Sequence, residues 1–334
     1  MLAALVCVPA PVPAVTAAEP VRILLVGDSV TQGSAGDWTW RYRLWQHLAS
    51  TSAEPVDLVG PRDDLYDRRT RLGGNHDYVD PAFDPEHAAR WGASLAVADV
   101  PVQQLVETYH PDVVVAFLGI NDLAVGATPT QVRQGLENLV LEARTADPAI
   151  DVVLAELVQS WVPGVIEVNE QLHQVVAAVD DPGARVVPAE TADGFGRRYD
   201  TYDGQHPSAR GEVLIAAAVA DSLAGLGIGQ PAARPLADVP DGPRIPVALS
   251  ATWRYGKVRL SWTASPGADG YRVLFRRPGV SRHWRLTGDT AKRRWVLPGL
   301  RPGERVQFGV LPRKGRYLAD PDVLSNVVRV PPLG

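Results

Sequence analysis

Short, almost continuously apolar runs alternate with helical patterns over the first two thirds of the chain. The apolar runs lie at residues 21–26, 55–59, 112–118, 150–157 and 185–188. Segments with helical periodicity lie between or after them, at 38–49, 97–109, 130–145, 165–179 and 208–226. Continuous apolar runs are typical of strands buried on both faces. The alternation predicts an α/β fold with a doubly wound, parallel, five-stranded sheet flanked by helices, and a site at the carboxyl ends of the strands.

The hydrophobic period changes to two near residue 246. The runs KVRLSW, GYRVLFR, RRWVL and ERVQFGVL alternate in polarity and are separated by Gly/Pro turns, which predicts a small all-β sandwich. A Pro-rich stretch precedes them and favours an extended, semi-stiff linker. We therefore expect a first domain at 19–227, a linker at 228–245 and a second domain at 246–334.

The N-terminal segment differs from the rest of the chain. Residues 1–18 are apolar, end in small residues and precede the first charge at Glu19, as in a signal peptide cut near Ala17 or Ala18. The alternative is an Ala/Pro tail, because no positive charge precedes the apolar run. A signal peptide implies a secreted, extracellular bacterial protein. Cleavage would remove Cys7, the only cysteine, so the mature chain is expected to have no disulfide and no thiolate metal site. No later apolar run approaches the roughly 18 residues of a membrane span.

The net charge of −5 hides a reversal between the two parts. Residues 1–245 carry 16 basic and 33 acidic side chains, whereas residues 246–334 carry 17 basic and 5 acidic ones. The basic part could contact an anionic polymer or the acidic first domain; nucleic acid is not expected, and a solvated charged face is the alternative. Its conspicuous arginines, near Trp284 and Trp295, are Arg276, Arg277, Arg282, Arg285, Arg293 and Arg294.

Four short stretches hold residues suited to acyl-transfer chemistry. In GDSVTQG, Ser29 follows the first strand, where it is either a nucleophile or a helix cap. In FLGIND, Asn121 is an oxyanion donor or a turn residue. In YDGQHPSARG, Asp203 and His206 are three residues apart, which lets the carboxylate hold one imidazole nitrogen while the other faces a nucleophile. In HAARWGASL, Gly92 is either an oxyanion donor through its backbone N–H or a glycine at the start of a helix.

Together these stretches resemble the SGNH hydrolase superfamily of GDSL esterases and lipases, over about residues 21–226. The resemblance implies a catalytic triad of Ser29, His206 and Asp203, and an oxyanion hole formed by the N–H groups of Ser29 and Gly92 with the amide of Asn121. It implies no metal and no cofactor. The second family block is degenerate here, so Gly73 or Gly74 is the alternative to Gly92. Asp28 is interpreted as a structural hydrogen-bonding residue.

Other conspicuous side chains have weaker cases. A loop cluster is interpreted as solvated rather than metal-binding, and comprises His76, Asp77, Asp80, Asp84 and His87. Tryptophans near the expected active edge could stack on sugar rings, with helix packing explaining Trp45 and one of the others; they are Trp38, Trp40, Trp91 and Trp161. The sandwich resembles a fibronectin type III domain, with Trp262 at the core position, and such domains are spacers or surface adaptors.

The layout is closest to the acetylxylan and carbohydrate esterase branch of the family. The resemblance therefore implies a secreted serine esterase that removes short acyl groups from carbohydrates through an acyl-enzyme. One alternative is a lipase or lysophospholipase with the same triad. A second is a non-catalytic protein that binds a polymer.

Overall fold

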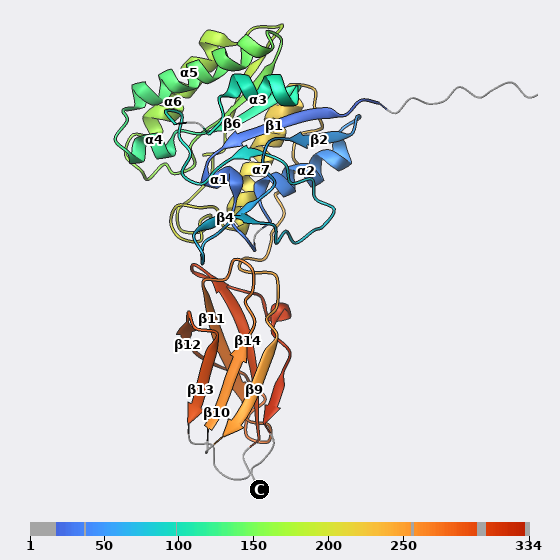
Figure 1. Ribbon diagram of the computed structural model, residues 1–334, viewed down its shortest axis with the longest axis vertical. Helices are drawn as coiled ribbons and strands as arrows, with labels where there is room; N and C mark the ends of the chain where they lie inside the picture. Colours follow the sequence, from blue (N-terminus) through green and yellow to red (C-terminus); the bar gives the residue numbers. More distant parts are fainter. Residues whose placement is uncertain (1–17, 37, 98, 255–256, 299–304, 331–334) are drawn as a thin grey trace, which may run out of the picture.

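The computed structural model describes residues 18–36, 38–97, 99–254, 257–298 and 305–330. The expected signal peptide, with Cys7, therefore lies outside the described residues apart from Ala18. Figure 1 shows an α/β domain and a long β-sandwich stacked end to end, with the sandwich below the α/β domain. The fold class predicted from the sequence is confirmed in both parts.

The central sheet of the α/β domain is parallel, with the order β2-β1-β6-β7-β8. These strands are β1 (Val21–Gly27), β2 (Val56–Val59), β6 (Val113–Phe117), β7 (Asp151–Ala155) and β8 (Val186–Ala189). The five predicted strands are thus all present. Their carboxyl ends lie along one edge of the sheet, where β1 and β6 are neighbours.

A sixth strand was not predicted. β5 (Ala88–Ala89) pairs in parallel with Val26 and Gly27 at the end of β1. A strand of two residues carries no alternation that a sequence pattern could reveal. It matters for function because it ties the segment that contains Gly92 to the strand that leads into Ser29.

Helices cover both faces of this sheet (Figure 1). They are α1 (Ser29–Gln32), α2 (Trp40–Thr51), α3 (Val102–Tyr109), α4 (Ile120–Ala124), α5 (Pro129–Ala146), α6 (Val165–Val179) and α7 (Ala209–Gly225). Side chains of α2 and α7 pack on one face in a core that includes Leu44 and Ile215. Side chains of α3 and α5 pack on the other, with Leu105 and Leu139.

Capping residues set where several helices begin. The side chains of Thr128 and Ser208 cap α5 and α7 by accepting from the N–H groups of Gln131 and Gly211. The first long helix starts at Trp40 rather than at residue 38 because the side chain of Thr39 accepts from the N–H of Tyr42. α3 starts at Val102, after Pro101, instead of near residue 97.

The long connection at residues 60–96 is ordered around a small hairpin. β3 (Leu65–Asp67) and β4 (Leu72–Asn75) pair antiparallel. The sequence pattern missed this hairpin because β4 contains two glycines and is largely exposed. In Figure 1, β4 lies at the end of the α/β domain that faces the sandwich.

The second domain consists of two antiparallel sheets, as a fibronectin-like sandwich requires. One has the order β13-β10-β9, and the other has β12-β11-β14-β15 with β16 beside β14. The elements are β9 (Leu249–Arg254), β10 (Lys257–Trp262), β11 (Gly270–Arg276), β12 (Arg285–Thr290), β13 (Arg294–Pro298), β14 (Val306–Lys314), β15 (Tyr317–Leu318), the 3-10 helix η1 (Pro321–Val323) and β16 (Val328–Val330). The core includes Trp262, Val273 and Phe308.

The predicted linker packs partly on the first domain. Ile228 and Ala232 contact the core beside α2 and α7, and the N–H of Ala232 donates to Asp221 at 2.7 Å. The start of the linker is therefore fixed to the α/β domain. Of the helices that the structure describes, none is both long and apolar enough to cross a membrane.

Candidate active site

Ser29 is the first residue of α1, directly after β1. Asp28 caps this short helix, with its Oδ1 accepting from the N–H of Val30 at 2.9 Å. A Cβ at Gly27 would lie 2.1 Å from the hydroxyl of Thr31, so glycine allows the helix to fold back tightly over the strand end. The cap belongs to Asp28, and the turn leaves the Ser29 side chain at the sheet edge.

The structure brings the three predicted triad residues into one hydrogen-bonded chain. Nε2 of His206 lies 3.2 Å from Oγ of Ser29, and Nδ1 lies 2.9 Å from Oδ2 of Asp203. Asp203 and His206 both come from the loop before α7. Ser29 lies 177 positions earlier in the sequence, and folding brings it next to His206. These distances suit proton transfer from the serine to the imidazole.

Asp203 is held as a carboxylate. Its Oδ1 accepts from the backbone N–H groups of Gln205 and His206, at 3.0 and 2.9 Å. Burial by itself would raise the pKa of Asp203, but the hydrogen bond and the charge of His206, with these two N–H groups, hold that pKa well below its usual value. The side chain is one-fifth exposed, at 19%. It therefore remains ionised at any pH where an imidazole acts as a base.

Asn121 lies next to this chain, at the start of α4 beyond β6. Its Nδ2 donates to the carbonyl of Ala93 at 2.8 Å and, at a longer 3.3 Å, to Oδ2 of Asp28. Burial, reinforced by the charge of Asp122, raises the pKa of Asp28 to about 7 against the stabilising N–H of Val30. The sequence interpretation of Asp28 as a structural hydrogen-bonding residue agrees with these contacts.

Of the three candidate glycines, the geometry favours Gly92. The N–H of Gly74 donates to Oδ2 of Asp64 at 2.5 Å, and Gly73 lies beside it in β4. Gly92 has a φ of +82°, and its neighbour Ala93 is bonded to Asn121. The loop is also tied to β1, since the N–H of Arg90 donates to the carbonyl of Gly27 at 3.1 Å.

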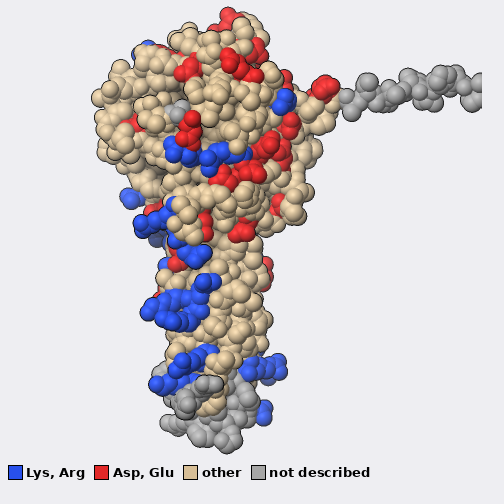
Figure 2. All heavy atoms as spheres, in the orientation of Figure 1, with Lys and Arg blue, Asp and Glu red and all other residues tan. Residues whose placement is uncertain are grey.

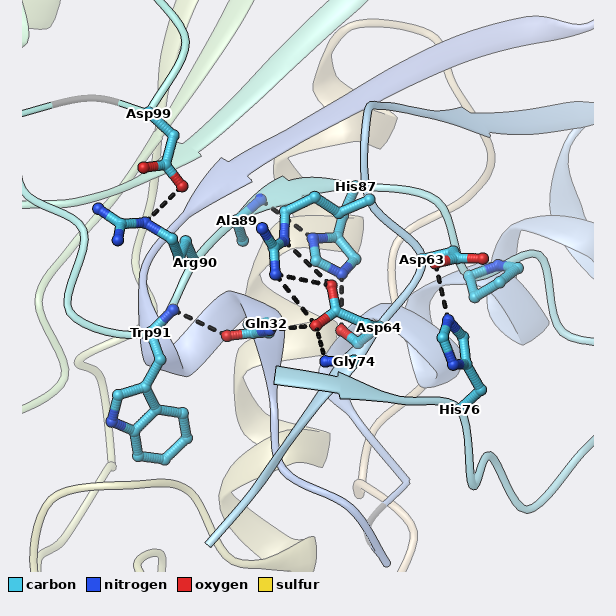
Figure 3. Close-up of polar contacts among 12 residues, drawn as sticks. Gln32, Asp63, Asp64, Gly74, His76, His87, Ala89, Arg90, Trp91 and Asp99 are labelled. Carbon is cyan, nitrogen blue, oxygen red and sulfur yellow. Dashed lines mark hydrogen bonds and ion pairs between the residues drawn. The ribbon is translucent and has the colours of Figure 1, made fainter. Parts of the chain in front are cut away.

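A chain of buried hydrogen bonds, here called the polar relay, fixes the backbone next to Gly92 through Gln32 and Asp64. Oε1 of Gln32 accepts from the N–H of Trp91 at 2.8 Å, and its Nε2 donates to Oδ2 of Asp64 at 3.0 Å. Figure 3 shows Gln32 between the Trp91 backbone and the Asp64 carboxylate. Arg62 binds both oxygens of Asp64 at 3.0 Å. No sequence pattern indicates these contacts, because the residues are separated by up to 59 positions.

Trp91 connects that loop with His206. Its ring stacks on His206 with 4.2 Å between centroids, and on Tyr66 with 4.0 Å. Trp40 is fully buried and donates to the carbonyl of Val30. The expectation of sugar stacking is therefore wrong for Trp40, and for Trp91 it stays a prediction.

The acidic and histidine-rich loop has structural contacts. His87 is fully buried rather than solvated: its Nε2 donates to the carbonyl of Asp64, and its Nδ1 accepts from the N–H of Ala89. His76 pairs with Asp63, and Asp84 accepts from the N–H of Leu58 (the first pair appears in Figure 3). Within the described ranges, no group of three His, Cys, Asp or Glu residues could hold a metal ion.

The sequence pattern also gave no sign of the role of Asp122, the one carboxylate of the FLGIND stretch. Asp122 is buried, and its two oxygens accept from the N–H groups of Leu95 and Ala96 at 2.9 and 3.0 Å. It thereby fixes the far end of the Gly92 loop. A cavity of about 320 Å³ adjoins this loop and is lined by Leu105, Leu118 and others, but not by Ser29 or His206.

Comparisons with known proteins identify the family of the α/β domain. Residues 25–214 match the GDSL-like Lipase/Acylhydrolase family, and these residues make up more than half of the chain. No curated protein sequence matches the chain. A crystal structure of a carbohydrate esterase family 3 from Talaromyces cellulolyticus is 25% identical, with a TM-score of 0.52, covering 62% of this chain and 97% of its own.

Two further solved structures are similar. An acetyl esterase mutant S10A with acetate ion has the same identity, TM-score and coverage as the first. A Clostridium thermocellum family 3 carbohydrate esterase is 23% identical, with a TM-score of 0.52, covering 63% of this chain and 100% of its own; it supports the fold alone. The chain belongs to the GDSL-like lipase/acylhydrolase family and is a serine ester hydrolase.

Proposed function

We propose that Ser29, His206 and Asp203 form the catalytic triad of a secreted esterase that removes short acyl groups from carbohydrates. The observation that carries the triad is the chain of contacts from Ser29 through His206 to Asp203, at 3.2 and 2.9 Å. His206 takes the proton of Ser29 as its Oγ attacks the ester carbonyl. Asp203 orients the imidazole and stabilises its cation.

The negative charge on the carbonyl oxygen is stabilised by three donors. These are the N–H of Ser29, the N–H of Gly92 and the amide of Asn121. The contact from the Asn121 amide to Asp28 is the longer and weaker of its two contacts. A small movement of the amide can therefore redirect that N–H to the oxyanion. His206 then protonates the leaving alcohol, and water repeats the sequence on the acyl-enzyme.

Two observations support short acyl groups on carbohydrates. The printed descriptions of the two neighbours at 25% identity are a carbohydrate esterase and an acetyl esterase with acetate ion. In this chain, the ring of Trp91 closes over His206, and the ring of Tyr202 lies 5.8 Å from it. Rings packed around the imidazole leave less room for a long acyl chain than for an acetyl group.

An ester panel tests this proposal and its alternatives. We expect kcat/KM to be highest for p-nitrophenyl acetate, to fall with chain length towards palmitate, and acetate to be released from acetylated xylan. Ser29→Ala is the control for non-enzymatic hydrolysis. A preference for palmitate would favour the lipase or lysophospholipase alternative. No hydrolysis of any ester, with no labelling of Ser29 by a fluorophosphonate, would favour a polymer-binding protein.

A further inference from the structure

The turn between β14 and β15 of the sandwich presses directly on the loop that carries Asp203 and His206. The N–H of Arg316 donates to the carbonyl of Tyr202 at 3.2 Å. A Cβ at Gly315 would lie 1.9 Å from the same carbonyl oxygen, and the φ of Gly315 is +52°. Only glycine permits this approach, so the two backbones are in tight contact one residue before Asp203.

Lys314, at the end of β14, is a buried cation inserted into the α/β domain. Only 1% of the residue is exposed. Its Nζ donates to Oγ of Ser34 at 2.5 Å and to the carbonyl of Ala35 at 3.3 Å, and lies 4.5 Å from the ring centre of Tyr202. A buried ammonium is costly unless it is fully paired. Partners from the first domain thus make Lys314 a fixed anchor.

Arg68 bridges the two domains at the catalytic acid. Its guanidinium lies 3.4 Å from Oδ2 of Asp203 and 3.3 Å from Oδ2 of Asp269, which belongs to the sandwich. It also lies 4.8 Å from the ring centre of Tyr202. Asp269 in turn accepts from the N–H of Gly315 at 2.9 Å. One arginine is therefore shared between a domain contact and the triad.

A second backbone contact closes the same interface. A Cβ at Gly267 would lie 1.7 Å from the carbonyl oxygen of Ala35, and a Cβ at Gly36 would lie 2.2 Å from that of Pro266. In Figure 1, this end of the sandwich meets the α/β domain near β4. Contacts this close are those of a packed interface, not of a loosely tethered spacer.

We propose that the sandwich is a positioning element of the active site: Lys314, Gly315 and Asp269 hold Tyr202 and Arg68 so that Asp203 and His206 keep their geometry. This inference rests on the proposed roles of Asp203 and His206. The residues named are positioning residues, because they act through the catalytic loop.

Two separate effects follow from the contacts. Lys314 and Gly315 fix Tyr202, which precedes Asp203 and whose N–H donates to the carbonyl of His206 at 3.1 Å. Asp269 draws part of the Arg68 charge away from Asp203. Without Asp269, Arg68 would compete with His206 for the same oxygen, Oδ2 of Asp203, and weaken the support that the carboxylate gives to the imidazolium.

The test compares full-length variants on p-nitrophenyl acetate, a substrate too small to need the sandwich for binding. We expect Lys314→Met to lower kcat roughly 10-fold with KM within about twofold, since a misplacement of 1 Å can cost about 10²-fold. Asp269→Asn keeps an acceptor for Gly315 but removes the charge. This variant should lower kcat about threefold. It should also move the acid limb of the pH–rate profile to lower pH, because Asp203 then supports the imidazolium of His206 less well.

Matched controls come from exposed positions of the same domain. Lys292→Met and Asp322→Asn should leave kcat and the pH profile unchanged. Circular dichroism and Tm show which variants are folded, and Asp269→Asn keeps the test open if Lys314→Met does not fold. Folded variants with wild-type kcat and pH profile would overturn the inference. An inactive wild-type protein would instead overturn the proposed function, which separates the two failures.

Discussion

Asp28 is an acidic residue with almost no access to water, placed between Ser29 and the amide of Asn121. It is 1% exposed, and burial raises its pKa from 3.8 to about 7. A carboxyl group whose pKa is raised on folding stabilises the protein most below its unfolded pKa. This contribution is lost as the pH rises from about 4 through about 7, where the folded carboxyl ionises.

Asp28→Ser should therefore flatten the pH dependence of stability. Serine keeps a side-chain acceptor for the N–H of Val30 but carries no charge next to Asp122. We expect Tm of the variant to rise relative to Tm of the wild type between pH 5 and about pH 7 and then to level off, with a total change equivalent to roughly 3 kcal/mol between pH 5 and pH 8. Thermal melts over that range measure the difference. Parallel Tm curves for the two proteins would contradict a raised pKa of Asp28.

Asn121 has the role most easily confused with that of a turn residue. Asn121→Ala should lower kcat by roughly 10²–10³, which is the usual effect of losing one oxyanion donor. Folding should change little, because the side chain is partly exposed at the start of α4 and the bonds to Gln32 and Asp122 still fix the Gly92 loop. Steady-state kinetics on p-nitrophenyl acetate decide the question: a kcat within a fewfold of wild type would leave Asn121 as a structural residue only.

At the residue scale, local motifs were informative and distant partners were not. Ser29, Asn121, Asp203 and His206 stand in short stretches whose spacing already indicates their chemistry. Nothing in the sequence next to Arg68 or Gln32 points to Asp203 or Trp91, because the side chains meet only after folding. Trp40 was misjudged because a position near a predicted sheet edge does not show how deeply a ring is buried.

At the scale of elements, the segment from β5 to Ala96 is an irregular loop that is fixed at several points. Arg90 bonds to β1, Trp91 to Gln32 in α1, Ala93 to Asn121 in α4, and Leu95 to Asp122. A loop without regular structure can hold Gly92 in place only through such contacts. The long α/β strands and helices were predictable from periodicity, whereas this loop depends on side chains from α1 and α4 and on the backbone of β1.

Gln32→Met tests how far the loop depends on one of these contacts. Methionine has a similar length but leaves the N–H of Trp91 without its partner, which costs about 1–3 kcal/mol for a buried group. Oδ2 of Asp64 keeps its bonds from Gly74 and Arg62. We expect a lower Tm and a kcat reduced roughly 10-fold through displacement of Gly92. Gln104→Met, on the exposed side of α3, is the control. An unchanged kcat in the folded variant would mean that Gln32 does not position the loop.

At the scale of the whole molecule, charge is distributed unevenly. Figure 2 shows Asp and Glu gathered on the α/β domain, and Lys and Arg along the left side of the sandwich and low on its right side. Yet the ion pair at the interface runs against the net charges, since the basic partner, Arg68, comes from the acidic domain. Arg282, Arg285, Arg293 and Arg294 are exposed. Binding of this face to an anionic polymer stays a prediction, with retention at low salt and release at about 0.5 M salt expected.

The contacts between the domains predict a particle whose shape does not depend on salt. Lys314 is buried and the glycine contacts are uncharged, so screening should hardly affect them. Small-angle scattering should give the same radius of gyration at low salt and at about 0.5 M salt. Extension of the particle at high salt would contradict a packed interface.

The linker composition by itself favoured a semi-stiff spacer, and no local pattern could reveal that its start packs on α2 and α7.

The central claim is that Ser29 becomes acylated with His206 as its base. Full-length protein quenched during turnover of p-nitrophenyl acetate, digested and examined by mass spectrometry, tests this most directly. We expect an acetyl group on the peptide that contains Ser29. In Ser29→Ala and in folded His206→Ala we expect that group to be absent and turnover to be lost. Turnover without acylation of Ser29, or near-normal turnover in either variant, would contradict this claim.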